Sequence, residues 1–284
     1  MKKILLASTI LVGTAGFAAA DNNNFTWSGE AYAGVAWSTT SGFAPEVTAS
    51  FTAGMATTTD GGLEAGAKIK IKAMGVSMNK DHTDGGFGTV TANGTTVPPE
   101  GTISDASVYL SGDFGKFEVV YDADGASATT YDVNFKYSNT WGDFTVAAYY
   151  TYDPSGTMTN GDMGVKLSYS MADYTFYVEP EWDASVTDYK IGFGASATMS
   201  GFTGAVDLDY ENATTDWDWK ASVKYATGPY SVGAFVEDDG VDDQMDYGAN
   251  VGYDLGGGVS LDAEYKWDAD TTGSIFAVGV SMKF

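Results

Sequence analysis

The chain has 284 residues, and its 38 acidic and 14 basic residues give a formal net charge of −24. All the basic residues are lysine, so bidentate arginine contacts are unavailable, and so acidic a surface would repel phosphates. These features exclude nucleic acid as a partner. The chain holds 36 Gly, 18 Tyr, 15 Phe and 7 Trp but no Cys, so no disulfide framework can stabilise it.

The first twenty residues have the pattern of a secretory signal peptide. Lys2 and Lys3 precede an apolar run from Ile4 to Phe17, and the small residues Ala18, Ala19 and Ala20 resemble a cleavage site. We expect residues 1–20 to be removed and one domain to span residues 21–284; an ordinary apolar N-terminal strand or helix is the alternative. Beyond residue 20 the sequence has no apolar run of about 18 residues, which excludes a spanning helix, so a membrane protein would have to be a β-barrel.

Apolar and polar residues alternate from residue 24 to the end, which is the period of a β-strand. In the closing segment Phe276, Val278 and Val280 fall on one face, while Ala277 and Gly279 fall on the other. Sixteen such segments are predicted, and fourteen or eighteen also fit because boundaries drawn from alternation shift by a few residues. The predicted strands are 24–38, 46–57, 63–74, 103–111, 116–122, 131–139, 143–152, 162–170, 173–183, 187–199, 202–211, 217–226, 230–238, 243–254, 259–268 and 273–284.

The connectors between these segments alternate between two kinds. Short Gly- and Asp-containing turns, such as 112–115 and 256–258, alternate with more acidic connectors, such as 153–162 and 237–243. An even number of antiparallel strands places both termini on one side, with seven short turns there and eight longer loops opposite, as in bacterial outer-membrane barrels. Aromatic residues lie near both ends of the segments, as two interfacial girdles would. A soluble β-sandwich also alternates, but it has no reason to sort its connectors in this way.

Several motifs resemble the general porins of the Rhodobacter type, which are sixteen-stranded trimeric barrels. They are 63–67 (LEAGA), 108–116 (VYLSGDFGK), 252–258 (GYDLGGG) and the closing Phe284. The resemblance implies a closed antiparallel transmembrane β-barrel in the outer membrane of a Gram-negative bacterium, exported through the periplasm. It also implies passive diffusion of small hydrophilic solutes and ions, a homotrimer, contacts with lipid and lipopolysaccharide, and a C-terminal Phe284 that barrel-assembly machinery recognises.

One connector departs from the family. In the family the loop after the fifth strand folds into the barrel as an acidic constriction, but here the matching connector, 122–130, is too short to fill a wide lumen. The segment 75–102 is the only connector long enough to replace it. The pore diameter therefore does not carry over from the resemblance.

The strand phase opposite the large apolar residues is expected to line a water-filled interior, because a lysine at mid-membrane on the lipid face costs about 2–4 kcal/mol. The predicted basic wall residues are Lys68, Lys70, Lys72, Lys136, Lys166, Lys190, Lys220 and Lys224. The predicted acidic wall residues are Asp105, Glu118, Glu179, Glu181, Asp207, Asp209, Asp262 and Glu264. Opposed rows of these charges would create a transverse field, and the acidic excess predicts a mild cation preference. The alternative is that this excess merely lies in solvated loops.

Other chemistry has little support in the sequence. The single histidine, His82, cannot build a catalytic triad or a histidine-rich metal site, so we expect neither an enzyme nor a cofactor. Acidic loops such as 238–243 could loosely hold calcium or magnesium, but no EF-hand spacing is present. Two other functions stay open. One is a solute-specific channel with a binding ladder of Tyr32, Tyr109, Tyr149, Tyr177 and Lys68 to Lys72, and the other is a narrow structural or adhesive barrel.

Overall fold

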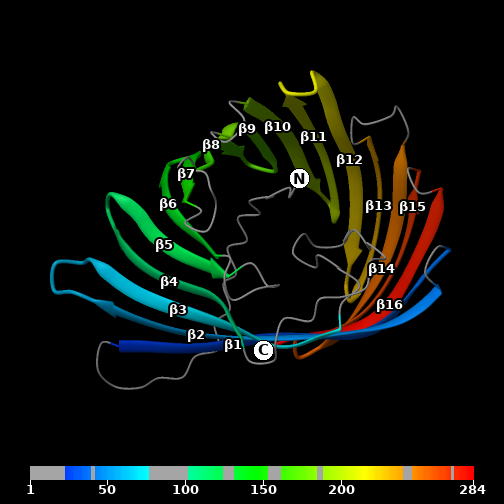
Figure 1. The fold of residues 1–284 in the computed structure, drawn as a ribbon, viewed down its shortest axis with the longest axis horizontal. Coiled ribbons are helices and arrows are strands. Elements are labelled where there is room, and N and C mark those ends of the chain that lie inside the picture. The colour runs from blue at the N-terminus through cyan, green and yellow to red at the C-terminus, as the bar shows by residue number, and fades with distance from the viewer. Residues whose placement is uncertain are drawn as a thin grey trace.

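Sixteen antiparallel strands close into a single barrel in the computed structural model, which describes residues 23–39, 42–76, 102–123, 131–152, 161–183, 188–238, 245–269 and 272–284 (Figure 1). Each strand pairs with its neighbours in the chain, and β1 pairs with β16 to close the ring. The strands are β1 (Asn23–Ser38), β2 (Gly42–Thr58), β3 (Glu64–Val76), β4 (Thr102–Gly112), β5 (Gly115–Ala123), β6 (Tyr131–Trp141), β7 (Phe144–Tyr152), β8 (Met163–Met171), β9 (Tyr174–Asp183), β10 (Asp188–Met199), β11 (Phe202–Glu211), β12 (Asp216–Thr227), β13 (Tyr230–Asp238), β14 (Asp246–Gly256), β15 (Val259–Asp268) and β16 (Gly273–Lys283). The predicted fold class and strand number are confirmed.

The seam between the first and last strands is continuous from Glu30 opposite Lys283 to Ser38 opposite Ile275. Beyond it, the N–H of Gly29 donates to the carbonyl of Phe284 at 2.8 Å, and the N–H of Phe284 donates to the carbonyl of Gly29 at 3.0 Å. Backbone hydrogen bonds therefore run round the whole ring, as a strand structure in hydrocarbon requires.

Seven short turns lie at the end of the barrel where β1 starts and β16 finishes. Glycine is required in several of them: Gly115 has φ of 100° and a Cβ there would also collide with the carbonyl oxygen of Ser138. The eight other connectors lie at the opposite end, as predicted, but not all are long, since only residues 39–41 join β1 to β2 and only residues 212–215 join β11 to β12.

The start of β2 differs from the prediction. The strand begins at Gly42 rather than at residue 46, because Pro45 does not interrupt it. Pro45 pairs with Val35 of β1, whereas pairing with β3 starts only at Val47, so the missing N–H of the proline falls where β2 has one partner strand.

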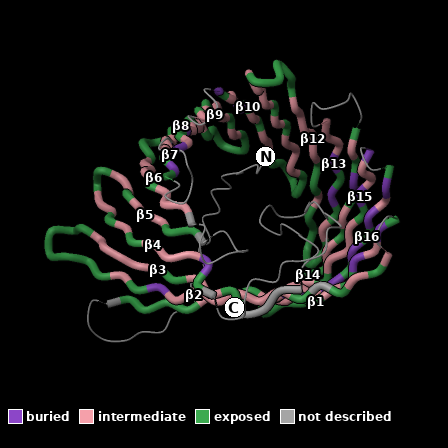
Figure 2. The backbone as a smooth tube through the Cα atoms, viewed as in Figure 1, coloured by how far each residue is buried: buried purple, intermediate pink, exposed green. Residues whose placement is uncertain are grey.

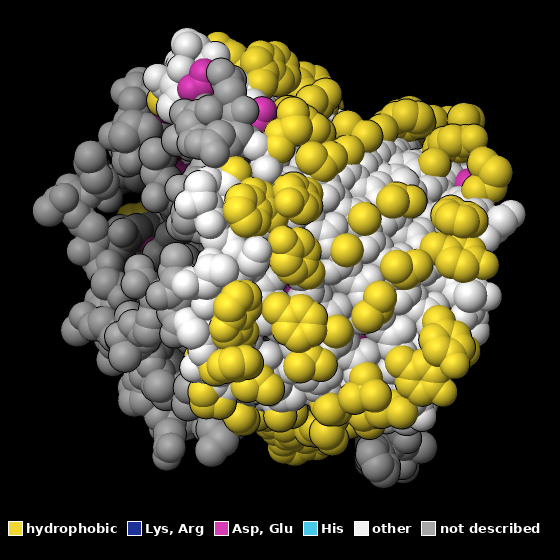
Figure 3. All heavy atoms as spheres, turned by 90° about the vertical axis from the view of Figure 1, so that its right-hand side faces the viewer, with side chains coloured by type: hydrophobic (Ala, Val, Ile, Leu, Met, Phe, Trp, Pro, Cys, Tyr) yellow, Lys and Arg dark blue, Asp and Glu magenta, His cyan; other side chains and the backbone are white. Residues whose placement is uncertain are grey.

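The large apolar side chains face outward. Val108, Val206 and Val278 are among the exposed residues of three widely separated strands. Figure 3 shows the outer wall on one side of the barrel, where apolar side chains spread over the backbone and no lysine is visible among them. The described residues that are buried are few and small or inward-facing, such as Ala36, Ala277 and Tyr32 (Figure 2). The side chains do not interdigitate between two stacked sheets, which excludes the sandwich alternative.

No helix in the described part of the chain is long and apolar enough to cross a membrane.

Candidate functional site

The inner face of the barrel carries the charged residues. Residues directly opposite each other in neighbouring strands point to the same side of a sheet, as do residues two apart in one strand. By this register every lysine in the described ranges shares one face, including Lys70 opposite Asp105, Lys136 opposite Glu118 and Lys220 opposite Asp207.

All the predicted wall residues lie on this same face. The basic ones are Lys68, Lys70 and Lys72 of β3, Lys136 of β6, Lys166 of β8, Lys190 of β10, and Lys220 and Lys224 of β12. The acidic ones are Asp105 of β4, Glu118 of β5, Glu179 and Glu181 of β9, Asp207 and Asp209 of β11, and Asp262 and Glu264 of β15.

A row of lysines and a row of acidic residues face each other across the barrel, but not all of the charged wall residues belong to these two rows. The lysine ladder of β3 and the acidic row Asp207, Asp209 and Glu211 of β11 stand eight strands apart in either direction round the ring. Other lysines are interleaved with the acids instead. Asp262 lies in the half of β15 nearer the short turns.

Several lysines form ion pairs with carboxylates on the same or a neighbouring strand. The ammonium of Lys166 lies 2.8 Å from Glu179, and that of Lys190 lies 3.3 Å from Asp209. Lys116 lies 2.6 Å from Glu118, two positions away in β5. These pairs neutralise part of the wall locally, so the net field at the wall comes from the excess carboxylates.

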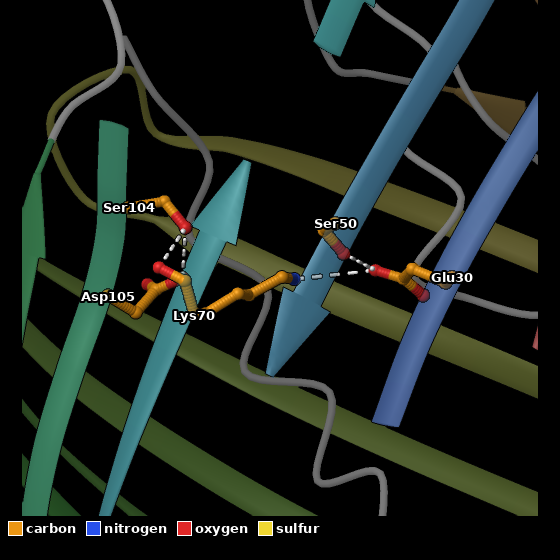
Figure 4. A network of polar contacts seen from close by, with 5 residues as sticks. All are labelled: Glu30, Ser50, Lys70, Ser104 and Asp105. Carbon is orange, nitrogen blue, oxygen red and sulfur yellow. Dashed lines mark hydrogen bonds and ion pairs between the residues drawn. The ribbon is translucent and has the colours of Figure 1, made fainter. Parts of the chain in front are cut away.

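Figure 4 shows the pairing around the β3 ladder. Lys70 reaches across β2 to Glu30 of β1 at 3.4 Å, and the hydroxyl of Ser50 donates to the same carboxylate oxygen at 3.1 Å. On the other side of β3, the hydroxyl of Ser104 lies 2.9 Å from Asp105 and 3.3 Å from the carbonyl of Lys70. Lys70 is thus held by Glu30 of β1 at its ammonium and by Ser104 of β4 at its carbonyl.

A second network joins β12 to β15. Lys266 lies 3.0 Å from Glu237 and 2.7 Å from Asp246, and Lys220 lies 2.9 Å from the other oxygen of Glu237. Glu237, Asp246 and Glu30 were missed as wall residues in the sequence; the register places them on the inner face, opposite Lys220, Glu237 and Lys283 respectively.

Among the described residues outside the strands, one titratable group has a shifted pKa. Asp162 precedes β8, and burial, together with the charge and hydrogen bond of Asp183 and the charge of Asp132, raises its pKa to about 6. This carboxyl therefore changes charge close to neutral pH.

Some predictions fall outside the described residues. They are the signal peptide at 1–20, His82 and most of the 75–102 segment, most of the 122–130 connector, and the acidic loop residues 239–243. Within the ranges that the structure does describe, no group of three or more His, Cys, Asp or Glu side chains is placed to hold a metal ion.

A closed sixteen-stranded barrel with an apolar outer wall and a charged inner wall defines a transmembrane β-barrel, and a barrel of this strand number leaves room for an aqueous channel. The family model described as Gram-negative porin matches residues 7–273, so the chain belongs to the Gram-negative porin family. It is accordingly an outer-membrane porin, in a family of channels rather than of enzymes.

Known porins are similar to this chain in sequence and in fold. The chain is 27% identical over 272 residues to a porin of Rhodobacter capsulatus, covering 81% of this chain and 89% of that protein. Two engineered variants of the porin of Rhodopseudomonas blastica superpose with TM-scores of 0.69 and 0.71 at 16% and 15% identity, in both cases covering 92% of this chain and 100% of theirs. At that identity the superposition shows the fold alone.

Proposed function

We propose that this porin is a general diffusion channel for small hydrophilic solutes and ions, with a mild preference for cations. The observation that carries the proposal is the charged inner face of the closed barrel, on which every lysine of the described ranges lies. Such a wall needs hydration, because unsolvated charges at membrane depth are costly.

The cation preference is supported by the local excess of carboxylates. Three neighbouring strands, β9 to β11, carry a single lysine, Lys190, on the inner face. Their inward acids are Glu179, Glu181, Asp183, Asp188, Asp207, Asp209 and Glu211. Rows of Asp and Glu along a channel favour cations, and this acidic excess lies on the strands rather than only in the connectors.

Planar-bilayer recording of the refolded protein tests the proposal. We expect stable single-channel steps and, in a potassium chloride gradient, a reversal potential shifted toward that of potassium. Replacing Asp207 and Asp209 by Asn should shift it toward chloride, whereas replacing Lys68 and Lys70 by Gln should shift it further toward potassium. A reversal potential nearer that of chloride for the parent protein would overturn the cation preference.

Liposome swelling with sugars of graded size separates a general channel from a narrow structural or adhesive barrel. A general channel admits small sugars at rates that fall with size, whereas a narrow barrel admits none. A solute-specific channel has less support, because two tyrosines of its predicted binding ladder already have their rings covered. Lysine ammonium groups lie 4.6 Å from the ring centroid of Tyr109 and 3.7 Å from that of Tyr177. Saturable block of the current by one sugar would favour that alternative.

We further propose that the protein is a homotrimer whose outer wall contacts lipid and lipopolysaccharide. We also propose that barrel-assembly machinery recognises Phe284, and that calcium or magnesium binds only loosely at the acidic connectors. The exposed apolar outer wall supports the membrane and subunit contacts. We infer that no substrate is turned over and no cofactor is needed. Gel mobility of the unheated protein, with and without a chelator, tests the oligomer and its dependence on divalent ions.

A further inference from the structure

Three inward tyrosines each stand directly opposite a glycine on the neighbouring strand. The pairs are Tyr109 with Gly66, Tyr149 with Gly164, and Tyr177 with Gly194. Glycine in a strand interior weakens the strand, and it often marks a place where another group approaches the backbone closely.

The tyrosine ring occupies the space that a side chain on the glycine would need. A Cβ added to Gly194 would overlap the ring of Tyr177, and the three nearest atoms all belong to that ring. The same holds at Gly164, where the nearest atoms all belong to Tyr149. The rings therefore lie flat against the inner wall and do not stand upright in the lumen.

The hydroxyl groups hold the far ends of the rings. Tyr149 spans Gly164 to donate to Glu181 at 2.9 Å, and Glu181 is the residue opposite Gly164 on its other side. The second pair repeats this arrangement, since Tyr177 spans Gly194 and donates at 2.6 Å to Asp207.

The third pair is a variant, in which Tyr109 donates at 2.8 Å to Glu64, two residues from Gly66 on the same strand. Hydrogen bonds from a hydroxyl to an ionised carboxylate are among the stronger ones, so each ring is fixed at both ends.

Two of the rings also position a lysine, namely Tyr109, whose ring centroid lies 4.6 Å from the ammonium of Lys116, and Tyr177. Lys166 lies 3.7 Å from the ring centroid of Tyr177 while it pairs with Glu179 at 2.8 Å. A cation over a tyrosine face is attracted by the ring, so the ring and the carboxylate together hold the ammonium close to the wall.

We propose that Gly66, Gly164 and Gly194 each widen the hydrated cross-section of the pore locally, because at each of them a tyrosine ring folds against the wall and away from the lumen. The proposal rests on the proposed function, since it needs an open channel. A methyl group at one of these positions would push the ring off the wall, release the carboxylate that it binds, and narrow the hydrated cross-section.

The test compares Gly194→Ala with the double variant Gly194→Ala, Tyr177→Leu in single-channel recording. We expect a lower conductance for the single variant and recovery to at least the parental value in the double variant, where the displaced ring is gone. Gly204→Ala is the matched control, because Gly204 lies on the outer face of β11 and a Cβ there meets only the carbonyl oxygen of Ser222 at 4.0 Å. Its conductance should equal that of the parent.

The outcomes separate the two proposals. A parent protein without conductance overturns the proposed function, whereas a conducting parent with unchanged conductance in Gly194→Ala overturns the inference. Loss without recovery in the double variant also overturns it, because the ring would not be the cause. Should Gly194→Ala fail to fold, Tyr177→Leu alone decides: parental or higher conductance supports a ring held against the wall, and lower conductance contradicts it.

Discussion

Replacing Lys266 by methionine removes the cation at the centre of the network between β12 and β15. Lys266 exposes only 11% of its side chain and lies 3.0 Å from Glu237 and 2.7 Å from Asp246. Removing one partner of a buried pair costs about 3–5 kcal/mol, because the remaining charges stay desolvated. We expect a loss near the lower end, about 3 kcal/mol, since Lys220 still pairs with Glu237 and Asp246 still accepts a hydrogen bond from the backbone of Ala269 at 2.8 Å.

Urea unfolding in lipid vesicles, followed by tryptophan fluorescence, measures this loss in the free energy of unfolding. Lys190→Met is the matched control, because Lys190 and Asp209 expose 30% and 35% of their side chains at a separation of 3.3 Å. Such a pair contributes about 0–1 kcal/mol. Equal losses in the two variants would refute the reasoning, because burial of the network would then make no difference to its contribution.

Three further outcomes are expected. The pKa of Asp162 is raised to about 6 from 3.8, so between these two values the folded protein keeps the proton that the unfolded chain has lost. The resulting stabilisation of the folded state is complete below about pH 4 and disappears as the pH rises through 6. Asp162→Asn should therefore gain stability relative to the parent between pH 4 and 7 in urea titrations, and a constant difference would contradict this. Val206→Lys, on the outer face of β11, should cost about 2–4 kcal/mol in lipid, whereas Ala205→Lys, one residue away on the inner face, should cost much less in the same assay. Deletion of Phe284 should lower the yield of folded, heat-modifiable protein in the outer membrane, and an unchanged yield would show that this residue is not needed for assembly.

The strands were predictable because each one has lipid on one side and water on the other. The boundaries expected for β11, β13 and β15 agree with the structure to the residue. The prediction was less accurate at Pro45, which is accommodated within β2, and at β14, which starts at Asp246 rather than at residue 243. In both places the deviation lies next to a connector, where only part of the ladder constrains the chain.

The faces of the charged residues were predictable, but their partners were not. Alternation assigns Lys190 and Asp209 to the inner wall, but it does not show that they form an ion pair at 3.3 Å, because that contact depends on the β10–β11 register, in which Lys190 stands opposite Glu211. A shift of two residues in the register keeps every side chain on its face and changes every cross-strand neighbour. The tyrosine–glycine pairs were missed for the same reason, since Tyr177 and Gly194 become neighbours only once the β9–β10 register is known.

Because β1 pairs with β16, the barrel can close only after both of these strands have been made. β1 can complete its hydrogen bonds only with β16, so a chain that has not yet folded as far as β16 presents an unsatisfied strand edge. A chain cut short before β16 would leave that edge open to any extended peptide nearby. Keeping the unfinished polypeptide solvated and apart from its own copies is therefore a requirement set by the circular topology itself.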